Sequence, residues 1–308
     1  MKDEVRAGVL VVIVAAVALL ACQRPAVNDV AAPTRTMRRV TDDLGRTIIV
    51  PVKITRVVST APSITEMVFA AGGGGRLVGV TTFCNYPEEA KSIAKIGDTM
   101  TPNMETIVAL KPDVVFVSTA SQLETFTRTL EQSGIAAYVT NPTSLDGVFE
   151  SMQNLAELLG ADDRTMNFVV TLSGRESFVR HALLLPRNGD AVTVVPVFVQ
   201  ISKEPLFTIG KESFLNQVIE AAGGRSVTDD VATAFPKLSK ETASTLRPEA
   251  IILSDSPDNQ EPNEVFRNSP AVKNGRVYKI NADILSRPGP RLVDALEQIA
   301  KVLHPEKF

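Results

Sequence analysis

The sequence predicts an α/β protein with two lobes that are joined by a long helical segment. Short apolar runs rich in β-branched residues alternate with helical patterns, which favours βα units and mainly parallel sheets. The segment from Leu145 to about Leu185 contains no such run and shows helical spacing instead. The stretches before and after it repeat a common pattern. These features indicate two similar halves connected by helix.

The N-terminus has the features of a secretory signal. Lys2 and Arg6 precede an apolar run, Ala7–Ala21, that is shorter than the roughly 20 residues a membrane-crossing helix needs. The run ends in Leu-Leu-Ala before Cys22 and resembles a bacterial lipobox, which implies cleavage before Cys22 and acylation of its sulfur. We therefore expect residues 1–21 to be a lipoprotein signal peptide and the mature protein to be periplasmic or on the cell surface, lipid-anchored to a membrane. The alternative is an uncleaved membrane anchor.

The chain after the signal is expected to divide into four parts. Residues 22–50 begin as a polar, proline-containing, aperiodic stretch and are expected to be the lipid anchor and a tether. The remaining chain is longer than one hydrophobic core usually serves, which predicts an N-terminal lobe at 51–144, linking helices at 145–187 and a C-terminal lobe at 188–308. The formal net charge is −3 and the pI is about 5.6, and these values argue against nucleic acid as a partner.

Strands and helices can be placed within these parts. The linking segment is expected to hold two helices broken near Gly160, with Asp162 or Asp163 as the cap of the second helix. Six apolar runs predict strands: Arg56–Ser59, Val114–Ser118, Ala137–Thr140, Val192–Val199, Ile251–Ser254 and Val277–Ile280.

A motif recurs in both halves with the same spacing. NMET at 103–106 leads through Leu-Lys-Pro-Asp into VVFV, and SKET at 239–242 leads through Leu-Arg-Pro-Glu into AIIL. We expect Asn103 and Ser239 to cap short helices whose glutamates face the positive end of the helix dipole. The proline of each motif should end its helix and hold the preceding residue extended.

A second repeated string precedes this motif in each half. AAGGGGRLV starts at Ala70 and AAGGRSV starts at Ala221, and both are typical of a helix end with a glycine C-cap. The two repeated strings occur in the same order in both halves, which strengthens the prediction of a duplicated βα architecture.

Several strings also carry a resemblance to a known family. They are RVVSTAPSITEMVFAAG, LVGVTTFCNYPEEA, NMETIVALKPD, PLFTIGKES, LSKETASTLRPEAIIL and DILSRPGPRLVDALEQI. Their order and spacing resemble the periplasmic solute-binding proteins for vitamin B12, ferric siderophores and haem, nearly throughout from Arg56 to the C-terminus. The resemblance implies two Rossmann-like lobes bridged by a single long helix, a small-molecule ligand in the groove between them, and an ABC importer as partner.

The resemblance assigns a role to the glutamates of the repeated motif. In that family each lobe presents one surface glutamate that docks into arginine pockets of the permease dimer, and the matching residues here are Glu105 and Glu241. The alternative role is that of a helix-dipole carboxylate, which contributes about 0.3 to 1 kcal/mol. That alternative accounts for either residue alone, but less well for the same residue at the same place in both copies.

The same match supplies candidate ligand-binding residues. Phe83, Phe207, Phe235 and Asp283 match groove residues of the members that bind vitamin B12, and Arg287 completes the set. Flat rings can cover a macrocycle, and a carboxylate can accept hydrogen bonds from amide groups. The alternatives are burial of the rings in the lobe cores and an ordinary surface ion pair between Asp283 and Arg287.

The ligand is left open by the sequence. The chain has no tryptophan, and its only cysteines are Cys22 and Cys84, whereas the B12-binding members have groove tryptophans and a disulfide. Cobalamin or a related corrinoid is the first expectation, and a ferric siderophore or haem is the alternative. The groove loops carry mixed charge and not the dense basic cluster that a highly anionic ligand would favour. Haem usually needs a Tyr or His ligand, and Tyr86, which the match places beside the groove, is the one candidate tyrosine.

The residue inventory argues against an enzyme. His181 and His304 are the only histidines, and neither belongs to a Ser-His-Asp arrangement or a metal cluster. In Gly210-Lys211-Glu212 an acid stands where a phosphate-binding loop needs Ser or Thr. No resident cofactor or metal is expected, and an exported enzyme or sensor on this scaffold would need a catalytic group that the sequence does not show. Cys84, without a neighbouring histidine, is expected to be a small half-buried side chain.

Overall fold

The computed structural model of the 308-residue chain describes residues 35–119, 123–185 and 193–308. Met37–Phe308 form one compact unit, whereas Met1–Thr36 are assigned to a separate unit. The predicted signal peptide and Cys22 lie outside the described residues. Within the described ranges, no helix is both long enough and apolar enough to cross a membrane.

The compact unit begins with an antiparallel hairpin, which corrects the predicted tether at 22–50. Strand β1 (Met37–Thr41) pairs with β2 (Thr47–Pro51), and Gly45 takes a positive φ of 75° in the turn between them. Asp42 in this turn is buried, and its carboxylate accepts a hydrogen bond from the backbone N–H of Val139 in the N-terminal lobe. Residues 37–50 are therefore part of the folded lobe, because their apolar alternation and their buried aspartate bind them to it.

The N-terminal lobe contains a parallel sheet in the order β4-β3-β5-β6. Its helix α2 begins with proline in the first turn, which suits the fixed φ of that residue. The elements of the lobe are β3 (Val57–Ser59), α2 (Pro62–Ala70), β4 (Leu77–Val80), α3 (Met104–Ala109), β5 (Val114–Ser118), α4 (Leu123–Gln132) and β6 (Ala136–Thr140).

The C-terminal lobe repeats this topology. Its parallel sheet has the order β10-β9-β7-β8, so each lobe starts on an inner strand, steps outward once and returns to the other side. The elements are β7 (Val195–Gln200), α7 (Phe214–Ala221), β8 (Gly224–Ser226), α8 (Lys240–Thr245), β9 (Ala250–Asp255), α9 (Pro270–Lys273), β10 (Val277–Asn281), α10 (Ala282–Leu285) and α11 (Leu292–Leu303). The predicted α/β class with two Rossmann-like lobes is confirmed.

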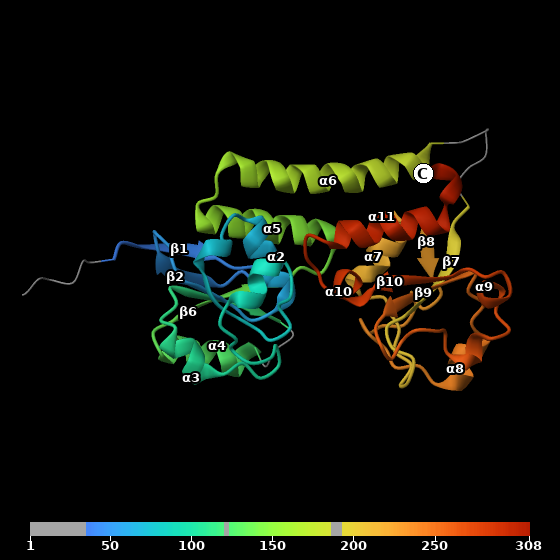
Figure 1. Cartoon of the computed structure of the whole chain (residues 1–308), viewed down its shortest axis with the longest axis horizontal. Helices are drawn as coiled ribbons and strands as arrows, with labels where there is room; N and C mark the ends of the chain where they lie inside the picture. The colour runs from blue at the N-terminus through green and yellow to red at the C-terminus, as the bar shows by residue number, and fades with distance from the viewer. Residues whose placement is uncertain (1–34, 120–122, 186–192) are drawn as a thin grey trace, which may run out of the picture. The chain divides into compact units, whose positions relative to one another are not determined.

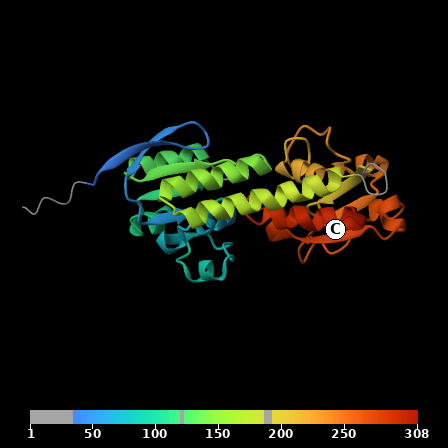
Figure 2. The same cartoon turned by 90° about the horizontal axis from the view of Figure 1, so that it is seen from above.

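Two helices connect the sheets, and the second spans both lobes. Helix α5 (Leu145–Leu159) ends at Gly160, which adopts the left-handed conformation of a glycine cap. Helix α6 (Asp163–Leu184) then runs over both halves and packs against α5 and α11 (Figures 1 and 2). The predicted break near Gly160 and the single long linking helix are both observed.

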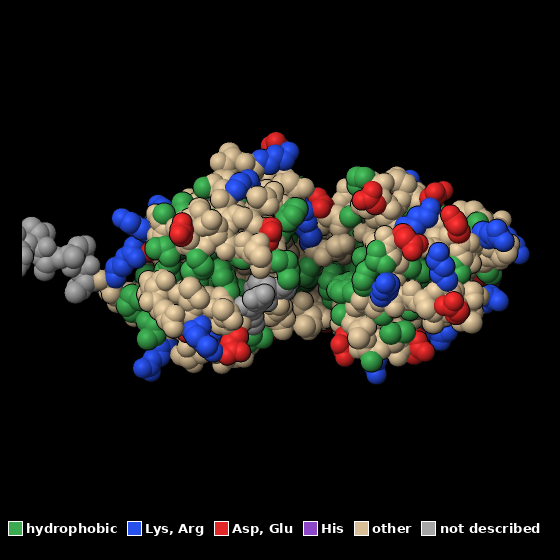
Figure 3. Space-filling model, turned by 90° about the horizontal axis from the view of Figure 1, so that it is seen from below, with side chains coloured by type: hydrophobic (Ala, Val, Ile, Leu, Met, Phe, Trp, Pro, Cys, Tyr) green, Lys and Arg blue, Asp and Glu red, His purple; other side chains and the backbone are tan. Residues whose placement is uncertain are grey.

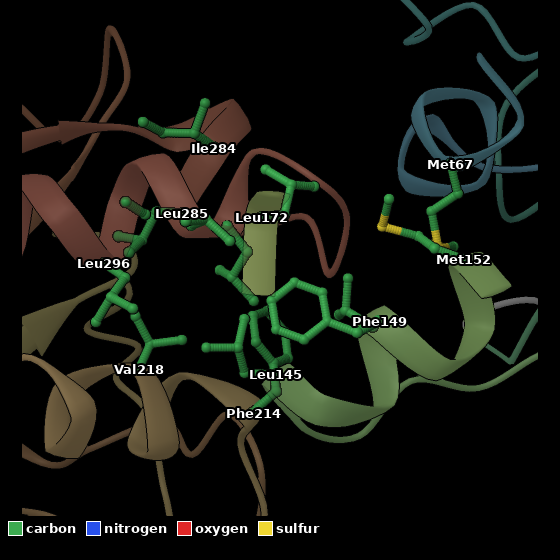
Figure 4. Packing of buried hydrophobic residues seen from close by; sticks show 14 of the residues in the cluster. Met67, Leu145, Phe149, Met152, Leu172, Phe214, Val218, Ile284, Leu285 and Leu296 are labelled. Atoms are coloured by element: carbon green, nitrogen blue, oxygen red, sulfur yellow. The ribbon is translucent and has the colours of Figure 1, made fainter. Parts of the chain in front are cut away.

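One apolar core runs through both lobes beneath α6. It joins side chains of α2 and α5 with those of α7 and α11 and includes Phe149, Leu172 and Phe214 (Figure 4). Two smaller clusters fill the opposite faces of the sheets, one under α3 and α4 and the other under α8 and α9. The shared core makes the two lobes parts of one packed body.

The repeated motifs fold as predicted, with one exception. Asn103 and Ser239 accept hydrogen bonds from the backbone N–H of Thr106 and Thr242 and so cap α3 and α8. The exception is Lys111, before the proline of the first motif, whose φ of 47° is left-handed and not extended as expected. The helix still ends before that residue, so only the local conformation of the exit differs.

Candidate functional site

Segments that follow strands of the two sheets meet between the lobes. The loop after β4 reaches the residues that follow β10, because the side chain of Asn85 bonds to that of Asp283. Figure 3 shows a hollow between the two lobes with hydrophobic side chains on both of its sides. Open α/β sheets bind ligands outside the carboxyl ends of their strands, so this hollow is the candidate ligand groove.

The three predicted aromatic residues lie in loops beyond the strand ends. Phe83, after β4, is 59% exposed, and Phe235 is 43% exposed. The ring of Phe235 meets that of Phe214 edge to face at a centroid distance of 6.4 Å. Phe207 is half-buried and pairs through its backbone with Ser202 and Lys237. Phe83 and Phe235 therefore offer ring surface to a ligand, while Phe207 is partly held in its lobe.

An apolar junction between the lobes connects this region to the shared core. Leu145 and Phe149, in the first turns of α5, lie beside Phe214 at the start of α7 (Figure 4). All three side chains are buried, and α5 and α7 are in contact. The edge-to-face contact of Phe214 with Phe235 places the exposed ring directly beside this junction.

Asp283 and Arg287 form a polar cluster with the N-terminal lobe. Arg287 Nη2 donates to Asp283 Oδ1 at 2.6 Å, and Arg287 Nη1 donates to Asn85 Oδ1 at 2.9 Å. Asn85 Nδ2 in turn donates to Asp283 Oδ2 at 2.8 Å. The ion pair between Asp283 and Arg287, which was the alternative to a ligand-binding role, thus exists, and Asn85 joins it to the N-terminal lobe.

Beneath this cluster lies a buried carboxylate, Glu66 of α2. Its side chain is 1% exposed, and its Oε1 accepts hydrogen bonds from Arg287 Nη1 at 3.1 Å and Arg291 Nη2 at 2.6 Å. Arg291 Nε donates to the other oxygen at 2.9 Å. Burial by itself would lower the pKa of Arg291, but the bonds and charge of Glu66 outweigh it and raise that pKa. The two lobes are therefore joined by ion pairs between Glu66 and two arginines.

Tyr86 lies next to this ion-pair network. The guanidinium carbon of Arg291 is 4.2 Å from the centre of the Tyr86 ring, which is a cation–π contact. Tyr86 also lines a cavity of about 380 Å³ together with Phe168, Leu172 and Arg291. This cavity reaches α6, so Tyr86 lies where the linking helix meets both lobes.

Glu105 and Glu241 occupy equivalent places in the two lobes. Both are exposed in the first turns of α3 and α8, which lie at corresponding ends of the lobes in Figure 1. The pKa of Glu241 is below its usual value because its carboxylate accepts hydrogen bonds from its own backbone N–H and from the Ser239 hydroxyl. Glu241 is therefore an exposed, fixed negative charge at neutral pH.

The remaining reactive side chains lie elsewhere. Cys84 is buried, with its sulfur 3.1 Å from the hydroxyls of Thr65 and Thr81, so the expectation of a half-buried residue was wrong. His304 is also buried, and its Nε2 lies 3.1 Å from the carbonyl oxygen of Gly223, while His181 is exposed on α6. No group of three or more His, Cys, Asp or Glu side chains in the described part of the chain could hold a metal ion.

Glu66 and Asn85 are absent from the residues predicted from sequence. Each makes its decisive contacts with residues roughly 200 positions away, and local spacing carries no signal for such a pair. The strings APSITEMVF and TTFCNYPEEA did contain both residues, but only as parts of a resemblance.

Comparison with known proteins agrees with this architecture. The protein-family model described as periplasmic binding protein matches residues 57–284. The vitamin B12-binding protein of Vibrio vulnificus is 29% identical over 257 residues, covering 80% of this chain and 89% of that protein. The uncharacterised ABC transporter substrate-binding lipoprotein YvrC of Bacillus subtilis is 29% identical over 315 residues, covering 98% of both.

A solved structure extends the similarity to three dimensions. The periplasmic vitamin B12-binding protein BtuF of Vibrio cholerae superposes with a TM-score of 0.71 at 25% identity, covering 82% of this chain and 97% of that one. The family match includes both sheets and the helix between them. We conclude that the chain belongs to the periplasmic binding protein family, and that it is a solute-binding protein acting outside the cytoplasm and not an enzyme.

Proposed function

We propose that this protein captures cobalamin or a related corrinoid between its lobes and delivers it to an ABC importer. The observation that carries the proposal is the pairing of exposed rings with a charge-balanced polar cluster at one groove. Phe83 and Phe235 can cover a flat macrocycle, and Asp283 with Arg287 can bind its amide side groups. The similarity to vitamin B12-binding proteins over most of the chain supports the same ligand.

The charges of the cluster favour a ligand without excess negative charge. Two carboxylates, Glu66 and Asp283, are matched by two guanidiniums, Arg287 and Arg291, so the cluster is formally neutral. An anionic ferric siderophore would find no surplus positive charge here. A neutral ligand that is rich in amides needs no surplus positive charge.

Haem is the second candidate, because Tyr86 is 47% exposed. A tyrosine oxygen can bind haem iron. However, Arg291 covers the ring of Tyr86, and the ring lines the cavity near α6. A haem bound through Tyr86 would have to approach from this cavity, whose lining includes neither Phe83 nor Phe235.

Delivery is proposed to use Glu105 and Glu241 as docking residues for the two halves of a permease dimer. This role is supported by three features: the two glutamates hold the same position in the repeated motif, both are exposed, and they lie on corresponding helices. A permease with two equivalent basic pockets would meet one glutamate from each lobe.

The membrane attachment is proposed to be a lipid on Cys22, with residues 22–36 as the tether. The short apolar run before Cys22 supports it, and the B. subtilis relative is named a lipoprotein. Fatty-acid labelling in cells tests this proposal: the wild type should carry the label and Cys22→Ser should not. Label on the variant would contradict a lipid at this residue.

The ligand proposal is tested by titrating cyanocobalamin into the purified protein in a calorimeter. We expect one site per chain, no chemical change in the ligand, and weakening by Phe83→Ala of roughly 1 to 2 kcal/mol, since a ring over a flat ligand contributes about this much. Val108→Ala is the control, because this residue is exposed on α3 and outside the groove loops. Binding of haemin but not of cyanocobalamin would overturn the proposal.

A further inference from the structure

The polar cluster at the groove contains a closed ring of three hydrogen bonds. Asn85 donates to Asp283, Asp283 accepts from Arg287, and Arg287 donates back to the amide oxygen of Asn85, over distances of 2.6 to 2.9 Å. Only one orientation of the Asn85 amide satisfies both neighbours, because its NH₂ must face the carboxylate and its oxygen the guanidinium.

In this ring the Asp283–Arg287 pair acts as a binding site, here called the receptor, for the carboxamide of Asn85. Asp283 supplies an acceptor for the amide N–H, and Arg287 supplies a donor for the amide oxygen, so the pair recognises both ends of one primary amide. The bound amide belongs to the N-terminal lobe, while the receptor belongs to the C-terminal lobe.

The receptor and its amide differ in how firmly each is held. Arg287 is 13% exposed and is also anchored by the buried carboxylate of Glu66. Asn85 is exposed, and the side chain of Asp283 is 38% exposed. Hydrogen bonds among exposed groups exchange with water at little net cost, so the Asn85 amide can leave while Arg287 stays in place.

We propose that the Asn85 carboxamide is an internal competitor for the ligand: it occupies the Asp283–Arg287 pair and is displaced by a primary amide of the incoming molecule. This inference rests on the proposed function and narrows it to neutral, amide-bearing ligands. A carboxylate in the same position would face the carboxylate of Asp283 and be disfavoured. The apparent affinity is then the intrinsic affinity multiplied by the fraction of molecules in which the pair is free of Asn85.

The first experiment compares cyanocobalamin binding by the wild type and by Asn85→Ala. Removing the competitor should tighten the Kd about 3- to 10-fold, the equivalent of the net value of one or two exposed hydrogen bonds. An unchanged or weaker Kd would overturn the inference, because Asn85 would then be either irrelevant or a direct ligand contact.

The matched control is Gln260→Ala. Gln260 Nε2 donates to Asp255 at 2.6 Å and its Oε1 accepts from Lys279 at 2.7 Å, so it is also an exposed amide between a carboxylate and a cation, but within one lobe. This variant should leave the Kd within about 2-fold of the wild type, since Gln260 bonds to Asp255 and Lys279 and not to Asp283 or Arg287. Equal tightening by both variants would show a general effect of surface amides and contradict the inference.

A second readout separates this inference from the ligand proposal. In the protein without added ligand, the side-chain NH₂ signals of Asn85, assigned by their loss in Asn85→Ala, should shift when Asp283→Asn removes their acceptor. In the wild type, saturating cyanocobalamin should move them to the position of a free amide. If the protein binds no cyanocobalamin but the Asp283→Asn shift is seen, the ligand proposal fails, while the hydrogen bond between Asn85 and Asp283 is supported. If the ligand binds and the signals do not move, the internal competition is refuted.

Discussion

Glu66 ties the two lobes together through a buried carboxylate. Its buried carboxylate accepts hydrogen bonds from two arginines of the other lobe. We expect Glu66→Gln to lower the free energy of unfolding by about 3 kcal/mol, because loss of one partner leaves poorly compensated charge in a buried site. Urea unfolding at neutral pH measures the change.

The control for this prediction is a solvent-exposed ion pair. Glu124 and Arg128 are four residues apart on α4 and both are exposed. Glu124→Gln should cost less than about 0.5 kcal/mol. Similar losses for the two variants would mean that the buried pair at Glu66 is no stronger than a surface one.

At the scale of residues, sequence could predict side chains and a pair within one lobe, but not the partners from the other lobe. The resemblance indicated Asp283 and Arg287, and the structure brings them together. Glu66 and Asn85 escaped notice because their roles depend on contacts with residues of the other lobe, about 200 positions away, which local spacing does not show. The unpredicted pairing changes the interpretation of Arg287, which is a tie between the lobes as well as a candidate ligand contact.

At the scale of elements, α6 is fixed to the C-terminal lobe by Arg175. This residue donates to Glu297 Oε1 at 2.9 Å and to Asp294 at 2.7 Å on α11. The pKa of Glu297 is lowered from 4.5, chiefly by the hydrogen bond from Arg175. A carboxylate with a lowered pKa stabilises the fold above its unfolded pKa, and this contribution is lost as the pH falls through the folded value.

We therefore expect Arg175→Gln to lower the free energy of unfolding by about 1 kcal/mol or less at pH 7, since the groups are partly exposed. The difference from the wild type should shrink as the pH falls below the usual value of 4.5. Urea unfolding as a function of pH measures both. A difference that is independent of pH would assign the effect to packing of the arginine stem.

Sequence predicted most elements because their signals are local. Caps, glycine ends and apolar runs gave the six predicted strands and the break near Gly160. The strands β1, β2, β4 and β8 were missed, and of these β1 has two adjacent arginines and β8 has the short sequence GRS. Their pairing is supplied by neighbouring strands, which a local pattern does not contain.

At the scale of the whole molecule, the duplicated topology is what makes docking on a symmetric partner geometrically reasonable. Each sheet has the same strand order, and each carries one exposed glutamate at the start of the equivalent helix. Glu105→Ala with Glu241→Ala should weaken binding to the importer by about 2 to 5 kcal/mol while leaving ligand affinity unchanged.

Importer binding, ligand affinity and the thermal unfolding temperature are measured in parallel for that double variant. The helix-dipole alternative predicts a stability loss of about 1 kcal/mol or less per glutamate and no separate loss of importer binding. Near-wild-type importer binding would remove the docking role from both residues.

The visible absorption spectrum of the protein isolated from its native host tests the central claim most directly. Corrin, haem and ferric complexes absorb differently, and the host offers all the ligands that the protein meets. We predict the absorption of a corrinoid, released on denaturation at no more than one molecule per chain. The bands of haem or of a ferric complex in its place would contradict the account.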